Sequence, residues 1–196
     1  GVGLGALHGN WLAFEADEGR AVRARKLDEV LDIYAGLMGG QPFSYTGEHF
    51  SASPVTELVP PPPVQTPHPP VWCVGLMLPG RSRQRSLERA ARWQGVFPAV
   101  AGGSLENPGS HLTPVSLREL VGHITTLRAA DGQSMEGYDV VVEGDSHGEF
   151  GTVHPPVEQW ADAGATWWVE SWWDLPDSPE GRAELRRRLE LGPPRT

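Results

Sequence analysis

The sequence predicts an α/β protein in which parallel strands alternate with covering helices. A strand-then-helix pattern can be read five times along the 196 residues, and such alternation is typical of a parallel sheet with helices outside it. Two architectures fit, an open doubly wound sheet and a (β/α)8 barrel. A TIM-type barrel usually takes about 250 residues. As a barrel, the chain would supply about the last five β/α units in one domain, residues 1–196, with the N-terminal units missing.

The first part of the chain combines a short glycine-rich strand, one helix and a long irregular segment. Residues 1–5 read GVGLG, which fits a crowded strand end better than a GxGxxG dinucleotide loop, because the third glycine comes one residue early. A Pro-rich excursion follows at about 39–70, with room for a short hairpin around Thr46 and Gly47. We expect it to return to the same sheet. The helix before it should bury one apolar face, formed by Leu27, Val30, Leu31, Tyr34, Leu37 and Met38.

The rest of the chain repeats short apolar runs and amphipathic stretches, which predicts four more β/α units. The strands are expected at 71–75, 95–98, 138–143 and 165–170, and the helices at about 82–92, from 113 on, at 155–163 and from 178 on.

Capping residues mark the ends of three of these helices. Thr113 precedes Pro114, and Ser178 precedes Pro179, so each pair predicts an N-cap followed by proline at the first helical position. Gly164 predicts a C-terminal stop.

Composition limits the classes of function. With 16 Lys and Arg against 25 Asp and Glu, the net charge is −9, which disfavours binding to nucleic acid or an anionic membrane. The basic run 186–188 lies among acidic residues and is expected on a solvated helix face. Cys73 is the single cysteine, so no internal disulfide forms, and we expect a small buried side chain. Without an 18-residue apolar run or a signal-peptide pattern, a cytoplasmic protein is expected.

The turn after the predicted strand 71–75 is the best candidate anion site. Gly75 and Gly80 allow close backbone approach, Arg81 carries charge, and Ser82 is a candidate N-cap for the next helix. Backbone N–H groups at such a helix start favour a phosphate. An ordinary βα loop is the alternative interpretation.

Other polar and aromatic groups gather at strand ends. Glu143 and Glu170 end strands that should be neighbours, so they could be an acid and base pair as in glycoside hydrolases, or each could have an arginine or helix-cap partner. The histidines show no metal-ligand spacing, so no metal is expected. The tryptophans around Glu170 could wall a flat cofactor or belong to the packing core; they are Trp167, Trp168, Trp172 and Trp173.

Several stretches together resemble the bacterial luciferase-like family of flavin monooxygenases, which includes enzymes that use the deazaflavin coenzyme. The opening GVGLG is similar to the end of the family's fourth strand, and the segment 23–50, RARKLDEVLDIYAGLMGGQPFSYTGEHF, to its following helix and insertion. The stretches PPVWCVGL, RAARWQGVFP and AGATWWVESW resemble its fifth, sixth and eighth strands. The resemblance implies that the chain begins within a longer barrel domain, at the end of its fourth strand.

The resemblance also implies the cofactor contacts. The flavin phosphate would lie in the loop after the fifth strand, at Gly75, Leu76 and the stretch from Gly80 through Arg81 to Ser82. Leu76 stands where the family usually has a second glycine, and Gln94 where it usually has Asp. The ring would lie near Gly3, Phe97 and Pro98, while the catalytic residues stay unassigned.

The expected function is that of a flavin- or deazaflavin-dependent oxidoreductase, acting as a monooxygenase or a hydride transferase on a small-molecule substrate. FMN and the deazaflavin coenzyme both remain open as cofactor. Because the resemblance implies that three strands are absent, we expect this chain alone to bind flavin weakly or not at all, without turnover. Two alternatives are a non-catalytic half-barrel that associates with another chain, including a second copy, and a barrel glycoside hydrolase using Glu143 and Glu170.

Overall fold

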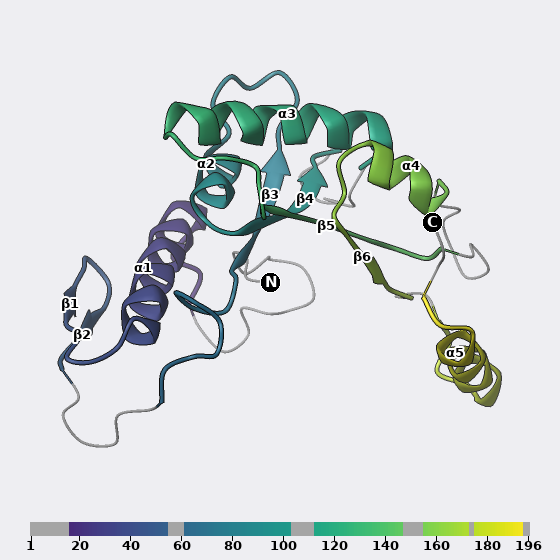
Figure 1. Cartoon of the computed structure of the whole chain (residues 1–196), viewed down its shortest axis with the longest axis horizontal. Helices are drawn as coiled ribbons and strands as arrows, with labels where there is room; N and C mark the ends of the chain where they lie inside the picture. The colour runs from purple at the N-terminus through teal and green to yellow at the C-terminus, as the bar shows by residue number, and fades with distance from the viewer. Residues whose placement is uncertain (1–15, 55–60, 103–111, 147–154, 173–174, 194–196) are drawn as a thin grey trace. The chain divides into compact units, whose positions relative to one another are not determined.

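The computed structural model describes residues 16–54, 61–102, 112–146, 155–172 and 175–193 (Figure 1). The chain divides into two compact units, residues 1–71 and 72–196. The predicted opening strand and Gly3 lie outside the described residues. The prediction that the whole chain forms one domain stays a prediction.

The first unit contains one long helix and a small hairpin. Helix α1 spans Arg20–Met38, and strands β1 (Tyr45–Thr46) and β2 (Ser51–Ala52) pair antiparallel, with Tyr45 opposite Ala52. The hairpin expected around Thr46 and Gly47 is therefore confirmed.

The predicted apolar face of α1 is only partly correct. Leu31 is buried, but Val30 is 46% exposed and Leu37 is 38% exposed. The reason is that α1 also buries a polar residue, Glu29, beside Leu31, so its buried face does not follow the apolar stripe alone.

Glu29 holds the hairpin turn through its carboxylate. Oε1 accepts the N–H of Glu48 at 2.8 Å, Oε2 accepts the N–H of Phe50 at 2.8 Å, and His49 donates to both oxygens at 3.1 Å. Burial raises the pKa of Glu29, but the three N–H groups, together with the charge of His49, outweigh it and hold the pKa below its ordinary value. The carboxylate thus accepts the hydrogen bonds that the three backbone N–H groups of the turn would otherwise donate to water.

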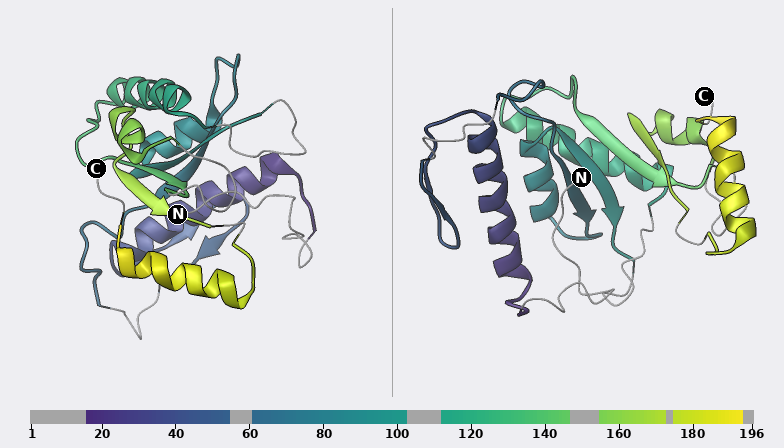
Figure 2. Two further views of the ribbon diagram at one scale, coloured as in Figure 1. Left: turned by 90° about the vertical axis from the view of Figure 1, so that its right-hand side faces the viewer. Right: turned by 90° about the horizontal axis from the view of Figure 1, so that it is seen from below.

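The second unit is built on a parallel sheet whose four described strands follow chain order (Figures 1 and 2). The strands are β3 (Trp72–Met77), β4 (Gly95–Val100), β5 (Asp139–Gly144) and β6 (Trp167–Glu170). The helices between and after them are α2 (Arg85–Arg92), α3 (Pro114–Ala130), α4 (Val157–Asp162) and α5 (Pro179–Leu191). The predicted parallel α/β arrangement is confirmed, while closure into a barrel stays a prediction.

The predicted caps of α3, α4 and α5 form. The Thr113 hydroxyl accepts the N–H of Ser116 and the Ser116 hydroxyl accepts that of Thr113, a reciprocal capping box. The Ser178 hydroxyl accepts the N–H of Gly181. Gly164 has a φ of +106° just after α4, a conformation that favours glycine.

The core lies between the sheet and α2 and α3. Alternate side chains of each strand point to this face, including the fully buried Cys73, as expected for a small apolar side chain. A Cβ on Gly75 would lie 2.6 Å from Val96 and 2.8 Å from Leu87, so only glycine lets α2 pack this close. The other members of the core include Leu117, Leu120, Ile124, Val140 and Val142.

The opposite face of the sheet carries a tryptophan–aspartate–tryptophan bridge. Trp72 Nε1 donates to one carboxylate oxygen of Asp139 and Trp167 Nε1 to the other, both at 2.8 Å. Gly95 lies between them in the register, and a Cβ there would lie 2.6 Å from Trp72 and 2.8 Å from Asp139. Glycine on β4 therefore lets β3 and β5 connect across it.

We expect Gly95→Ala to lower the free energy of unfolding by about 1–3 kcal/mol, the usual cost of overpacking. Gly122→Ala is the matched control, because a Cβ at Gly122 meets nothing within 4 Å and alanine favours a helix interior by up to about 1 kcal/mol. Urea unfolding followed by circular dichroism measures both. Equal stability of the two variants would contradict the bridge geometry.

A second prediction concerns the Glu29 carboxylate. The pKa of Glu29 is lower in the folded state than in the unfolded chain. The ionised carboxylate therefore stabilises the fold at neutral pH, and this stabilisation is lost as the pH falls through the unfolded-state pKa to the folded-state pKa. Amide exchange by NMR, corrected for intrinsic rates, should show protection of Glu48, His49 and Phe50 at pH 7 that decreases toward pH 3. Glu29→Gln should reduce this protection at pH 7, and Glu48→Gln should not. Protection that is constant with pH would refute the prediction.

Candidate functional site

The turn between β3 and α2 is held by the side chain of Gln84. Its Oε1 accepts the N–H of Leu78 at 2.9 Å, and its Nε2 donates to the carbonyls of Leu78 and Arg81, each at 2.8 Å. The N–H of Arg81 donates to the carbonyl of Leu78 at 3.1 Å, and Gly80 has a φ of +75°. Gln84 is buried, so these bonds are shielded from competing water.

The prediction that Ser82 caps α2 is wrong. The N-cap is Gln84, which makes no side-chain cap bond, because its amide is committed to the turn. The helix therefore starts three residues later than expected. Ser82 and Arg81 are both exposed, and neither side chain has a hydrogen bond or ion pair with another described residue.

A pocket of about 290 Å³ lies between this turn and α3. The last residue of β3, Met77, lines it together with turn residues 78–81 and Gln84. Helix α3 contributes Glu119, Gly122, His123 and Thr126. Of the site residues that the sequence predicts, Gly80 and Arg81 line this pocket and Ser82 does not. The pocket combines a guanidinium, an imidazole and a carboxylate, so it suits a polar ligand group.

The remaining predicted cofactor contacts lie inside strands. Gly75 and Leu76 belong to β3, where Gly75 packs against α2 and the N–H of Leu76 donates to the Ser86 hydroxyl at 3.0 Å. Phe97 and Pro98 belong to β4. Because side chains alternate, Phe97 faces the side of the sheet opposite α2, while Pro98 is buried on the α2 side. Leu76, two residues after Val74 on β3, faces the same side as Phe97. The structure therefore brings Leu76 and Phe97, but not Gly75 and Pro98, to the face opposite α2, which we call the open face.

Glu143 and Glu170 are not brought together. Glu143 lies opposite Val169 and Glu170 lies opposite Gly144 in the parallel register. Residues in register point to the same face and their chain neighbours to the other, so the two carboxylates point to opposite faces of the sheet. An acid and base pair across one bond requires both on the same face.

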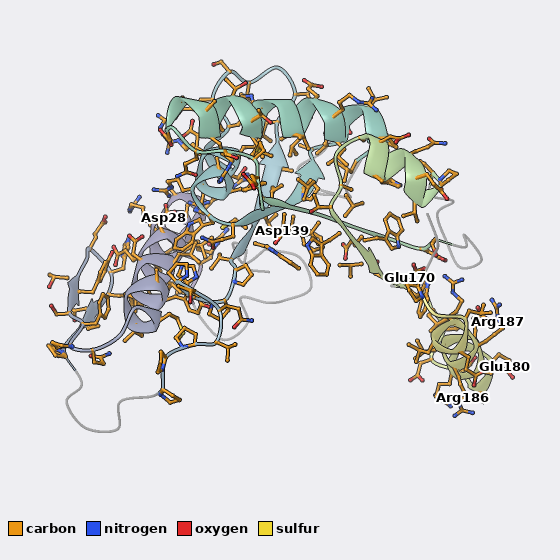
Figure 3. The ribbon with its side chains drawn as sticks, in the orientation of Figure 1. Asp28, Asp139, Glu170, Glu180, Arg186 and Arg187 are labelled. Carbon is orange, nitrogen blue, oxygen red and sulfur yellow. The ribbon has the colours of Figure 1, made fainter. Side chains whose placement is uncertain are left out.

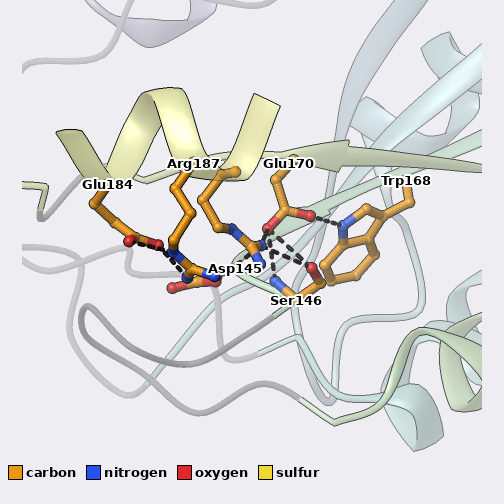
Figure 4. Close-up of polar contacts among 7 residues, drawn as sticks. Asp145, Ser146, Trp168, Glu170, Glu184 and Arg187 are labelled. Atoms are coloured by element: carbon orange, nitrogen blue, oxygen red, sulfur yellow. Dashed lines mark hydrogen bonds and ion pairs between the residues drawn. The ribbon is translucent and has the colours of Figure 1, made fainter. Parts of the chain in front are cut away.

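Glu170 instead has the arginine partner that was the alternative interpretation. Its Oε1 accepts Arg188 Nη2 at 2.7 Å, the Ser146 N–H at 2.8 Å and the Ser146 hydroxyl at 3.0 Å. Its Oε2 accepts Trp168 Nε1 at 2.8 Å (Figure 4). With four donors on its two oxygens, this carboxylate is a fixed structural acceptor.

Arg188 joins α5 to the carboxyl ends of β5 and β6. Its side chain is 5% exposed, lies 3.8 Å from Asp145 and stands 5.2 Å from the Trp172 ring. Burial lowers the pKa of Arg188, and Asp145 opposes that change. Arg186 and Arg187, labelled with Glu170 in Figure 3, are exposed. The expectation of a solvated basic run is therefore right for those two and wrong for Arg188.

The tryptophans divide between packing and surface. Trp168 packs against Trp160 with ring centroids 6.4 Å apart, whereas Trp167 is 51% exposed beside Trp72 on the open face. Trp172 stacks on Arg188, and Trp173 lies outside the described residues. Two of the four predicted tryptophans, Trp168 and Trp172, thus serve packing.

Sequence reasoning missed Gln84, His123 and Arg188 as site residues. Gln84 just before a helix carries no motif, and Arg188 is hidden inside a basic run. His123 had a usable signal, since it lies at i+4 from Glu119 on a helix whose other face is apolar.

No protein-family model matches this chain. Within the described residues, no group of three or more His, Cys, Asp or Glu side chains is arranged to hold a metal ion. None of the helices in those ranges is both long and apolar enough to cross a membrane.

We expect strong coupling between Glu170 and Arg188 in a double-mutant cycle with Glu170→Gln and Arg188→Met. Removing one partner leaves the other charge buried and unpaired, which lowers the free energy of unfolding by about 3–5 kcal/mol. The loss in the double variant should therefore be about 1–3 kcal/mol smaller than the sum of the two single losses. The exposed pair Arg83–Glu88 serves as control, with coupling below about 1 kcal/mol. Coupling no larger than that of the control would show that Arg188 does not secure α5.

Proposed function

We propose that the chain is part of a flavin- or deazaflavin-dependent oxidoreductase of the luciferase-like class, and that the pocket beside Arg81 receives the phosphate of the cofactor. The observation that carries the proposal is the pocket at the carboxyl end of β3. Ligands of parallel α/β proteins bind at that end of the strands. The resemblance over most of the chain supports the class of enzyme.

The residues of the pocket fit a phosphate group. Arg81 supplies a guanidinium that no described residue engages, and guanidinium groups bind phosphate oxygens with two parallel hydrogen bonds. A Cβ at Gly80 would meet nothing within 4 Å, so the backbone is open to a ligand there. Glu119 is the one opposing charge among the lining residues.

The size of the pocket suits one end of the cofactor. Sites for whole drug-sized ligands span about 300–1,000 Å³, whereas this pocket has about 290 Å³. The phosphate would occupy it, and the ring would extend beyond. The cofactor supplies the redox chemistry in such enzymes, so Arg81 and the turn would hold its position.

The open face of the sheet favours the alternative of association with another chain. Val74 is 42% exposed and Trp167 is 51% exposed on that face, and contiguous exposed apolar patches of several hundred Å² are typical of contact surfaces. Sedimentation velocity at several concentrations distinguishes a monomer from an assembly, and colourless protein that self-associates without binding flavin would favour this alternative.

Arg81→Ala should raise the dissociation constant for FMN at least tenfold, which is about 1.4 kcal/mol, and should leave that for riboflavin unchanged. The reason is that only FMN carries the phosphate that Arg81 would bind. Fluorescence titration up to about 1 mM ligand covers the weak binding expected of this chain.

The control is Arg83→Ala, because Arg83 pairs with Glu88 and lies outside the pocket. A change in FMN affinity of twofold or less in Arg81→Ala, or an equal loss in Arg83→Ala, would overturn the assignment of Arg81 to the phosphate.

A further inference from the structure

One face of α3 lines one side of the pocket. Glu119, Gly122, His123 and Thr126 follow the i, i+3, i+4, i+7 spacing of a single helix face. A Cβ at Gly122 would meet nothing within 4 Å, so the wall is open at its centre. The ligand space therefore reaches the two ionisable side chains on either side of that glycine along the helix.

The imidazole of His123 is available to form a hydrogen bond with a ligand in the pocket. It is half-buried, and its imidazole has no hydrogen bond or ion pair with any residue in the described ranges. The hydroxyl of Thr126, by contrast, donates to the carbonyl of Gly122 at 3.0 Å. His123 thus remains able to donate to a ligand.

The charges of the pocket show what His123 must do for a phosphate. When the imidazole is neutral, the charges of Arg81 and Glu119 sum to zero, so Arg81 is the one cationic donor for an anion among the lining residues. When His123 is protonated, the three groups sum to one positive charge, and two cationic donors face the ligand from the two walls. Histidine is the side chain whose charge changes most readily between pH 5 and 8.

We infer that His123 is the second cationic contact of this pocket, and that the pocket selects a phosphate monoester with its terminal oxygens free. This inference rests on the proposed function and deepens it. Two cationic donors match the two negative charges that such a phosphate carries above its second pKa of about 6. FMN carries its phosphate in that form, whereas the deazaflavin coenzyme and FAD carry theirs esterified on both sides. The donor set therefore favours FMN as the cofactor.

Binding in this way takes up a proton. The bound dianion stabilises the imidazolium, so affinity is high where His123 is protonated in the complex and falls as pH rises and that proton is lost. Glu119 faces the same site from α3 and Arg81 from the turn. The phosphate, with a second pKa of about 6, is already a dianion between about pH 7 and 8.5, so a change in FMN affinity over that range tests the contact with His123.

The test is fluorescence titration with FMN, riboflavin and FAD at pH 7, 7.5, 8 and 8.5. For the unmodified chain, the dissociation constant of FMN should rise about tenfold across this range, while those of riboflavin and FAD stay within twofold. His123→Gln should bind FMN about tenfold more weakly at pH 7 and show no further pH dependence. Glu119→Gln should bind FMN several-fold more tightly, a gain that misfolding cannot produce.

The outcomes separate the two proposals. If Arg81→Ala weakens FMN binding and His123→Gln keeps both the affinity and the pH dependence, the inference is overturned and the proposed phosphate site stands. If FAD gains and loses affinity in parallel with FMN, the selection for a monoester is overturned. If the unmodified chain binds FMN and riboflavin equally, both proposals are wrong.

Discussion

The close packing of α2 on β3 at Gly75 is the constraint on which the candidate site depends. The missing Cβ lets Leu87 and Val96 pack together over the strand, which holds α2 against the sheet. The buried Gln84 then stands at the start of that helix and holds the turn from Leu78 to Arg81 through three hydrogen bonds. Arg81 lines the same pocket as one face of α3, and a turn held in one conformation can position a charge without further loss of entropy.

At the carboxyl ends of β5 and β6, on the opposite side edge of the sheet from β3, a buried ion pair and its hydrogen bonds hold the structure together. Glu170 collects Arg188, Ser146 and the Trp168 indole at the carboxyl ends of β5 and β6. This cluster secures α5, and it removes Glu170 from any role as a free acid or base. The polar groups after β3 and those after β5 and β6 therefore differ in what they bind. The hydrogen bonds of Gln84 leave the Arg81 guanidinium available to a ligand, whereas the groups around Glu170 form hydrogen bonds with one another.

Sequence reasoning predicts the parallel sheet and two of the helix starts because local rules decide them. Thr113 with Pro114 and Ser178 with Pro179 cap their helices by contacts within a few residues. It misplaces the start of α2, because the choice between Ser82 and Gln84 depends on the carbonyls of the turn. It also misses Arg188, because the partner of that residue lies 18 positions away on another element. Burial of Glu29 is equally nonlocal, since hairpin amides about 20 positions away supply its partners.

The central claim is that the turn after β3 and the facing side of α3 form one phosphate site. The most direct measurement is an amide NMR spectrum of the ¹⁵N-labelled chain, assigned and then titrated with FMN and with inorganic phosphate. We predict that both ligands shift the amide resonances of Gly80, Arg81, Gly122 and His123, and that riboflavin does not. Phosphate-dependent shifts that avoid these four residues, or that are the same for riboflavin and FMN, would contradict the account.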